Sequence, residues 1–145
     1  MSHCFILLAA GKGKRFRSKT LKQFHILNGK PLIYHSIEKA IKSKIFKEII
    51  IVTNSKIKKP KQSFIKIIKG GSERFKSSKN AIEYIKNKTF KNVFIHDAAR
   101  PNFSIKLLQK LKKELANNNA VIPYINTDHS VKYKTGSNLT NLKRE

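Results

Sequence analysis

The sequence predicts an α/β fold built on a mostly parallel sheet. Short apolar runs rich in β-branched residues, which are typical of buried parallel strands, alternate with amphipathic helical segments. In addition, small and polar residues directly follow three of these runs, at residues 9–15, 70–74 and 96–101. Ligands of open α/β sheets bind outside the carboxyl ends of the strands, so we expect these three segments to converge on one crevice.

Each element is predicted from its own pattern. Strands are expected at residues 5–8, 49–52, 65–68, 93–95 and 121–122. Pro31 suits the first turn of a helix, whose apolar stripe is Leu32, Ile33, Ile37, Ala40 and Ile41. Further helices are expected over residues 77–85 and 104–115, the latter with Ser104 as its N-cap. Alternating strands and helices favour right-handed crossovers.

Two segments outside this pattern have a different character. Residues 56–61 are charged and contain Pro60, which predicts a solvated loop. Residues 130–134 and 139–142 are extended segments around a turn, which predicts a hairpin arm. Because an isolated two-stranded ribbon is marginally stable, we expect the arm to pack on a partner, a second copy of the chain.

Size and charge bound the function. The 145 residues fit a single domain, 1–145. The net charge of +24 invites a nucleic-acid interpretation, but lysines supply 27 of the 32 basic residues and are scattered over every expected helix and loop. Nucleic-acid binding is therefore not expected to be the main role.

The single cysteine and the absence of targeting patterns indicate in which cellular compartment the protein resides. Cys4 lies in the first apolar run, so a buried hydrophobe in a reducing environment is favoured over a catalytic thiol. We find no long apolar span and no signal peptide. The expectation is a cytoplasmic protein with no membrane association.

The first loop has the character of a phosphate site. Gly11 and Gly13 allow backbone N–H groups to approach oxygens that a Cβ would keep away, and Arg15 and Lys22 can neutralise charge. Spacing alone leaves open that Lys22 is simply a solvated lysine. Alone this loop is a weak signal, but together with the segments at residues 70–74 and 96–101 it indicates a nucleotide-handling enzyme domain.

The other two segments supply further candidates. Asp97 ends an apolar strand, and Mg²⁺ usually takes one or two carboxylates beside substrate phosphates. An N-cap role, or a pairing with Arg100, remains an equal alternative for this acid. His96 is interpreted as an oriented or buried imidazole rather than a base, and Ser77 and Ser78 could bind a ligand or cap their helix.

Together these motifs resemble, in order and spacing, the 2-C-methyl-D-erythritol 4-phosphate cytidylyltransferases over the whole chain. The resemblance is carried by Ala9-Ala10-Gly11-x-Gly13-x-Arg15, Lys22-Gln23-Phe24, Gly29-Lys30-Pro31-Leu32, Gly70-Gly71-x-Glu73-Arg74-x-x-Ser77 and His96-Asp97-Ala98-Ala99-Arg100-Pro101. It implies a Rossmann-like nucleotidyltransferase fold with a protruding β-arm. It also implies a reaction of CTP with methylerythritol phosphate that forms 4-diphosphocytidyl-2-C-methyl-D-erythritol and pyrophosphate, in non-mevalonate isoprenoid biosynthesis.

The resemblance also implies roles for particular residues. Arg15 and Lys22 would be catalytic, and Asp97 would hold Mg²⁺. The residues implied to bind the nucleotide are Ala9, Ala10, Gly11, Gly13, Gly71, Ser72, Arg74, Ser77 and Ala98. Those implied to bind the second substrate are Arg100, Ser130, Lys132 and Arg144, of which the last three belong to an arm that reaches across a homodimer.

Three departures from the family pattern qualify this expectation. Leu21 stands where a proline commonly precedes the lysine, and His129 stands where the family has an acid. The chain stops at Glu145, within the arm that starts near residue 128, where the resemblance predicts a further strand, helix and substrate-binding lysine. We therefore expect this chain to be the amino-terminal portion of a longer protein. One form that the longer protein could take is a chain that continues into a second enzyme of the same pathway.

Two alternative functions remain open. One is a ribitol 5-phosphate cytidylyltransferase, against which Ala99 and Lys132 favour methylerythritol phosphate. The other is an inactive nucleotide-binding or nucleic-acid-binding fragment. Salt separates a CTP site from nucleic-acid binding, because specific binding of CTP with Mg²⁺ should survive physiological ionic strength, whereas attraction of nucleic acid to scattered lysines falls steeply.

Overall fold

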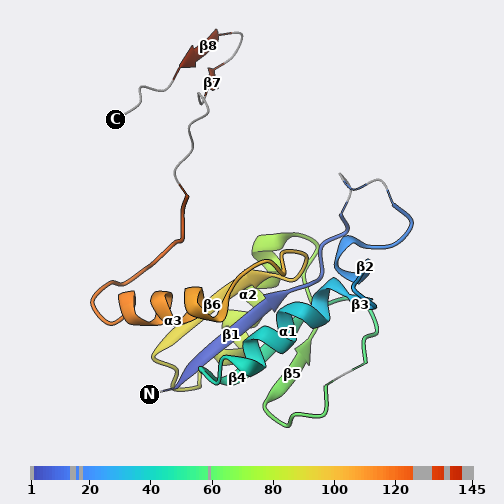
Figure 1. Ribbon diagram of the computed structural model, residues 1–145, viewed down its shortest axis with the longest axis vertical. Helices are drawn as coiled ribbons and strands as arrows, with labels where there is room; N and C mark the ends of the chain where they lie inside the picture. Colours follow the sequence, from blue (N-terminus) through green and yellow to red (C-terminus); the bar gives the residue numbers. More distant parts are fainter. Residues whose placement is uncertain are drawn as a thin grey trace.

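A four-stranded parallel sheet forms the centre of the molecule (Figure 1). The computed structural model describes residues 2–13, 16, 18–58, 60–125, 132–135 and 138–141. The sheet has the order β5-β4-β1-β6, and all three pairings are parallel. Its strands are β1 (His3–Leu8), β4 (Phe46–Val52), β5 (Ile65–Ile68) and β6 (Asn92–Asp97). The four predicted runs up to residue 95 are therefore confirmed as strands.

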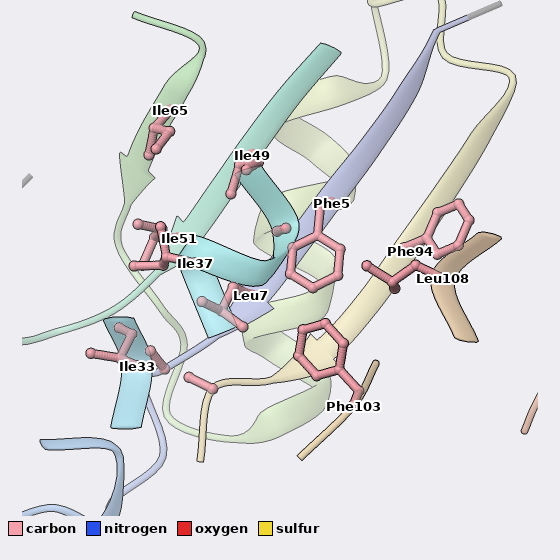
Figure 2. Packing of buried hydrophobic residues seen from close by; sticks show 13 residues of the cluster. Phe5, Leu7, Ile33, Ile37, Ile49, Ile51, Ile65, Phe94, Phe103 and Leu108 are labelled. Carbon is pink, nitrogen blue, oxygen red and sulfur yellow. The ribbon is translucent and has the colours of Figure 1, made fainter. Parts of the chain in front are cut away.

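Helices cover both faces of this sheet. Side chains of α1 (Leu32–Lys42) and α3 (Ile105–Glu114) pack on the face of β1 that carries Phe5 and Leu7 (Figure 2). The helix α2 (Arg74–Ile85) packs on the opposite face, against Cys4 and Ile6. Because both faces of β1 are covered, all six of its residues are buried, as its continuous apolar pattern predicts.

The helix boundaries follow local chemistry. Ser104 is the N-cap of α3, and its Oγ accepts a hydrogen bond from the Leu107 N–H at 3.0 Å, which confirms the predicted cap. In α1 the buried side chains include Ile33, Ile37 and Ala40 of the predicted stripe. The helix α2 begins at Arg74, three residues before the predicted start, so its first turn adjoins Gly70-Gly71.

The fifth predicted strand, at residues 121–122, is wrong. Residues 121–125 have no regular structure, and the side chain of Ile122 is 83% exposed. Two apolar residues are shorter than a typical strand, and Pro123 has no N–H to donate to a ladder. Among the described strands of this sheet, β6 is consequently an edge strand.

A short antiparallel hairpin that the sequence analysis did not predict follows the first loop. It comprises β2 (Ile26–Leu27) and β3 (Lys30–Pro31), and the 3₁₀ turn η2 (Lys22–Phe24) precedes it. Asn28 and Gly29 both adopt positive φ, at 47° and 77°, which is the backbone of the tight turns that Asn-Gly pairs favour. The hairpin brings the segment around Lys22 back onto the start of α1.

The strands β7 (Lys132–Thr135) and β8 (Asn138–Asn141) pair antiparallel and form a separate two-stranded sheet. This pairing confirms the extended segments predicted for the arm over residues 132–134 and 139–141, and residues 130, 131 and 142 lie outside the described residues. The described part of residues 56–61 has no helix or strand, as expected. None of the described helices has the length and hydropathy that a membrane crossing requires.

Candidate active site

The three small-residue segments meet at one cavity of about 480 Å³ beyond the carboxyl ends of β1 and β6. Its wall is formed by residues 8–13, Lys22 and Gln23, residues 71–74 with Ser77, and Asp97, Ala99 and Arg100. The topology explains this convergence, because parallel neighbours place their carboxyl ends at the same edge of the sheet. The predicted single crevice is present.

The end of β1 is fixed on both sides before the chain enters the cavity wall. The Ala9 N–H donates to the Val52 carbonyl at 2.8 Å, and the Ala98 N–H donates to the Leu8 carbonyl at 2.9 Å. Beyond this point Gly13 has a φ of +59°, a conformation that most L side chains resist. We call residues 9–13 the strand-end loop. These backbone hydrogen bonds fix the position at which this loop begins.

Two glycines after β5 allow close approaches of the backbone, Gly70 to the strand-end loop and Gly71 to the first turns of α2. A Cβ built on Gly70 would lie 2.2 Å from the Ala10 Cβ, and one on Gly71 would lie 2.3 Å from the Lys76 Cβ. The Ser77 hydroxyl, which is almost fully buried, accepts a hydrogen bond from the Gly71 N–H at 3.1 Å. Ser77 thus fixes the loop that lines the cavity, while the Ser78 hydroxyl donates to the Arg74 carbonyl at 3.2 Å.

Asp97 lies between two arginines. Its Oδ1 is 3.1 Å from the Arg74 Nε, and its Oδ2 is 3.3 Å from the Arg100 Nε. The carboxylate therefore joins the first turn of α2 to the turn after β6. Of the alternatives open from sequence, the pairing with Arg100 is present, and Arg74 is an additional partner.

His96 holds the turn after β6 through two ring contacts and one hydrogen bond. Its ring lies against Phe5 and Phe103, and its Nε2 is 2.8 Å from the Arg100 carbonyl oxygen. Since a carbonyl oxygen only accepts, Nε2 carries the proton and donates. Burial lowers the pKa of His96, although the bond to Arg100 opposes this shift. The imidazole is oriented and holds the backbone of the turn, in agreement with the sequence interpretation.

Lys22 reaches the cavity from the η2 turn. Its Nζ lies 5.9 Å from the centroid of the Phe16 ring, which in turn contacts the His25 ring edge-on at a centroid distance of 4.6 Å. The amide of Gln23, the next residue, donates to carbonyl groups of the strand-end loop. These contacts place a cation on the same cavity as the glycine-rich backbone.

Most of the candidate residues that the structure describes come together here. Those in the cavity wall are Ala9, Ala10, Gly11, Gly13, Lys22, Gly71, Ser72, Arg74, Ser77, Asp97 and Arg100. Ala98 is fully buried in the core behind the wall, because its N–H continues the pairing with β1, and Ala99 faces the cavity instead. Arg15, Ser130 and Arg144 lie outside the described residues, and Lys132 is described only as backbone of β7.

The sequence analysis gave no site role to Gln23 or Glu73, which also line the cavity. Both stand inside motifs that carry the family resemblance, Lys22-Gln23-Phe24 and Gly70-Gly71-x-Glu73-Arg74, and those motifs were the signal that could have found them. Glu73 matters for the chemistry of a metal, because it gives the wall a second carboxylate beside Asp97. The described residues hold no cluster of three metal-ligating side chains, and one or two carboxylates beside phosphates is the arrangement that suits Mg²⁺.

A parallel sheet covered by helices on both faces, with a glycine-lined, cationic cavity at its carboxyl edge, defines a Rossmann-like α/β fold. A family model described as 2-C-methyl-D-erythritol 4-phosphate cytidylyltransferase (IspD) matches residues 3–140. The chain belongs to this family.

Two curated relatives illustrate the similarity in sequence. The bifunctional enzyme IspD/IspF of Pelagibacter ubique is 52% identical over 149 residues, which cover all of this chain and 40% of that protein. The 2-C-methyl-D-erythritol 4-phosphate cytidylyltransferase of Lachnoclostridium phytofermentans is 32% identical over 90% of this chain and 59% of its own length. The chain thus spans about half the length of these relatives.

Solved structures agree on the fold. The bifunctional IspDF of Campylobacter jejuni superposes with a TM-score of 0.81 at 26% identity, covering 97% of this chain and 37% of that one. The Francisella tularensis IspD superposes with a TM-score of 0.74 at 28% identity, covering all of this chain and 67% of that one. The Rossmann-like nucleotidyltransferase fold expected from the sequence is confirmed.

Proposed function

We propose that this chain carries the CTP-binding part of an enzyme that transfers a cytidylyl group to 2-C-methyl-D-erythritol 4-phosphate. The observation that carries the proposal is the convergence of the strand-end loop, Lys22 and Asp97 on one cavity. Membership of the IspD family supports the same reaction. The products are 4-diphosphocytidyl-2-C-methyl-D-erythritol and pyrophosphate.

The chemistry requires positioning and charge stabilisation. A phosphate oxygen of methylerythritol phosphate attacks the α-phosphorus of CTP, a new P–O bond forms, and the bond to the β-phosphate oxygen breaks with release of pyrophosphate. Lys22, together with Arg15, neutralises charge that develops on the phosphoryl oxygens. Backbone N–H groups beside Gly11 and Gly71 face the phosphates, and no covalent intermediate with the protein forms.

Asp97 and Glu73 are the residues that would hold Mg²⁺ at this cavity. When bound beside the triphosphate, the metal would supply charge neutralisation. The donor chemistry fits, since both side chains offer hard oxygen ligands and the phosphates complete the set. In the proposed complex Arg74 and Arg100 exchange the carboxylate for phosphate oxygens, and Arg100 contributes to binding of the second substrate.

The β7–β8 arm is proposed to act across a homodimer in the cytoplasm. A two-stranded sheet on its own is marginally stable, and β7 and β8 pair only with each other among the described strands. Ser130, Lys132 and Arg144 would then bind methylerythritol phosphate in the neighbouring copy's site. Sedimentation of the purified chain tests this, and a monomer at every concentration would contradict it.

The direct test of the reaction is pyrophosphate release by the purified chain with CTP, Mg²⁺ and methylerythritol phosphate. Lys22→Ala should reduce turnover by about 100-fold or more, the scale of one lost transition-state donor. Lys110→Ala, on the exposed side of α3, is the matched control, and ribitol 5-phosphate tests the alternative substrate. CTP-dependent thermal stabilisation without turnover would restrict the proposal to nucleotide binding.

Absence of both turnover and CTP binding would overturn the proposal. Repeating the binding measurement at low and physiological salt separates a specific site from general attraction of polyanions. Binding of CTP with Mg²⁺ should persist at physiological salt, whereas nucleic acid held by scattered lysines should dissociate.

A further inference from the structure

We propose that Gln23 is a positioning residue that fixes Lys22 against the strand-end loop. This inference rests on the proposed function, because it concerns how the same cavity holds its cation. No role follows for Gln23 from its side-chain chemistry alone, since an amide neither carries charge nor transfers protons at neutral pH. Its contacts supply the role.

The Gln23 amide uses both of its protons on one neighbouring segment. Its Nε2 lies 2.8 Å from the Ala9 carbonyl oxygen and 3.2 Å from the Gly11 carbonyl oxygen. The side chain is only 4% exposed, so water does not compete for either bond. A single side chain therefore ties the η2 turn to two carbonyls of the strand-end loop, those of Ala9 and Gly11.

The η2 turn is held by the packing of Phe24 against the hydrophobic core, and Gln23 supplies its side-chain bonds to the strand-end loop. The η2 turn is three residues long, its N-cap Leu21 makes no side-chain capping bond, and Gln23 is its buried residue. The Lys22 backbone nevertheless comes close to the loop, with its nitrogen 3.8 Å from a Cβ built on Gly13. Because Lys22 precedes Gln23 directly, the bonds of the amide determine where the lysine side chain leaves the backbone.

The same bonds also set the polarity of the loop. Carbonyl oxygens carry partial negative charge and would oppose a triphosphate nearby. Gln23 engages the Ala9 and Gly11 carbonyls, and the Ala9 N–H donates to Val52, so the donors that the loop can offer to the ligand are those beyond Ala9. Gln23 thus affects both the cation and the backbone that form the proposed phosphate site.

The experiment is a double-mutant cycle that reads CTP affinity. Gln23→Met keeps the length of the side chain and removes both donors, and Gln23→Asn keeps an amide that is too short to reach both carbonyls. Each is measured alone and combined with Lys22→Ala, with Gln109→Met on the exposed surface of α3 as the matched control. The probe is CTP with Mg²⁺, and thermal unfolding verifies that every variant is folded at the assay temperature.

A positioning role predicts non-additive losses. Gln23→Met should weaken CTP binding by about 10–100-fold in the parent chain, the range typical of lost supporting hydrogen bonds. In the Lys22→Ala background the same substitution should weaken it by much less, because the cation that Gln23 positions is already gone. Gln23→Asn should follow the same pattern with a smaller loss, and Gln109→Met should bind as the parent does.

The inference would be overturned if Gln23→Met weakened CTP binding by the same factor in the parent chain and in the Lys22→Ala chain. It would also be overturned if the Gln23→Met chain bound CTP as the parent does. Should Gln23→Met fail to fold, the cycle with Gln23→Asn decides on the same criterion. Failure of the proposed function has a different signature, since the parent chain itself would then neither bind CTP nor release pyrophosphate.

Discussion

Replacing Gly70 with alanine should distort the candidate active site by a predictable amount. Gly70 is buried, its N–H donates to the Asn54 Oδ1 at 3.1 Å, and it is absent from the positive-φ glycines, so its backbone accepts an alanine. The obstacle is space: the new Cβ would lie 2.2 Å from the Ala10 Cβ and 3.2 Å from the Ser77 Oγ. Two carbon atoms pack at about 3.5–4 Å, so Ala10 and residue 70 must separate by more than about 1 Å.

The energetic consequence follows from this overlap. Forcing an extra methyl group into a packed site costs about 1–3 kcal/mol. The restriction that alanine imposes on the unfolded chain returns about 0.4–1 kcal/mol. The free energy of unfolding should therefore fall by about 1–2 kcal/mol. Because Ala10 belongs to the strand-end loop, a shift of about 1 Å should also weaken CTP binding, by a factor on the order of 100.

Urea unfolding and CTP titration of Gly70→Ala measure these two effects. The matched control for stability is Gly11→Ala, because a Cβ built on Gly11 meets nothing within 4 Å and its φ is not positive. A Gly70→Ala chain that unfolds at the same urea concentration as the parent and binds CTP equally would refute the reasoning.

Three further predictions concern other parts of the chain. Gly11→Ala should raise the free energy of unfolding by about 0.4–1 kcal/mol, because its Cβ meets no neighbour and alanine restricts the unfolded chain. It should nevertheless reduce CTP affinity by about 10-fold or more, because its methyl group occupies space in the cavity wall; unchanged titrations would contradict this. His3 is buried with its Nδ1 unpartnered among the described residues, and burial, followed by the charge of Lys112, lowers the pKa of His3. A lowered histidine pKa means that the unfolded chain binds the proton more tightly, so stability should fall as pH drops below about 6.5. His3→Phe should flatten that dependence in urea unfolding at pH 7.5 and 5.5, and equal slopes in both chains would argue against the cause. Cys4 is fully buried, and burial raises the pKa of its thiol to about 12. The native chain should therefore react with a thiol reagent only on unfolding, and rapid labelling in buffer would disprove its inertness.

The sequence predicted the fold correctly where the local residue pattern and the packing around it favour the same secondary structure. The run at residues 65–68 is β-branched, and it became β5 with the same bounds. Ser104 precedes a regular leucine pattern, and it became the cap of α3. Residues 121–122 are β-branched too, but the predicted strand does not form there. A strand also needs a neighbouring strand to pair with, and the hydrophobic pattern alone does not show whether one is present.

The candidate active site also has features that the sequence predicted and features that it did not. Parallel topology alone brings residues 9–13, 71–74 and Asp97 to one edge, so their convergence was predictable once the strands were assigned. The bonds of Gln23 were not, because its acceptors are backbone carbonyls 14 and 12 residues earlier, and any polar side chain near the loop would have satisfied the sequence pattern. The same holds for Ala98 and Ala99, whose opposite directions depend on how far β6 continues its pairing with β1.

The turn after β6 combines a fixed backbone with exchangeable side chains. Asp97 is 30% exposed, and its partners Arg74 and Arg100 are 65% and 76% exposed. Ion pairs this accessible contribute about 0–1 kcal/mol each, so exchanging the carboxylate for phosphate oxygens costs the protein little. The backbone does not share this freedom, because the Arg100 carbonyl accepts from His96 and the Arg100 N–H donates to the Asp97 carbonyl at 3.1 Å. The proposed reaction, which binds a triphosphate and releases pyrophosphate in every cycle, would need this separation. Strong resident ion pairs would oppose binding of the triphosphate, whereas a mobile backbone would leave the arginine charges without a fixed position.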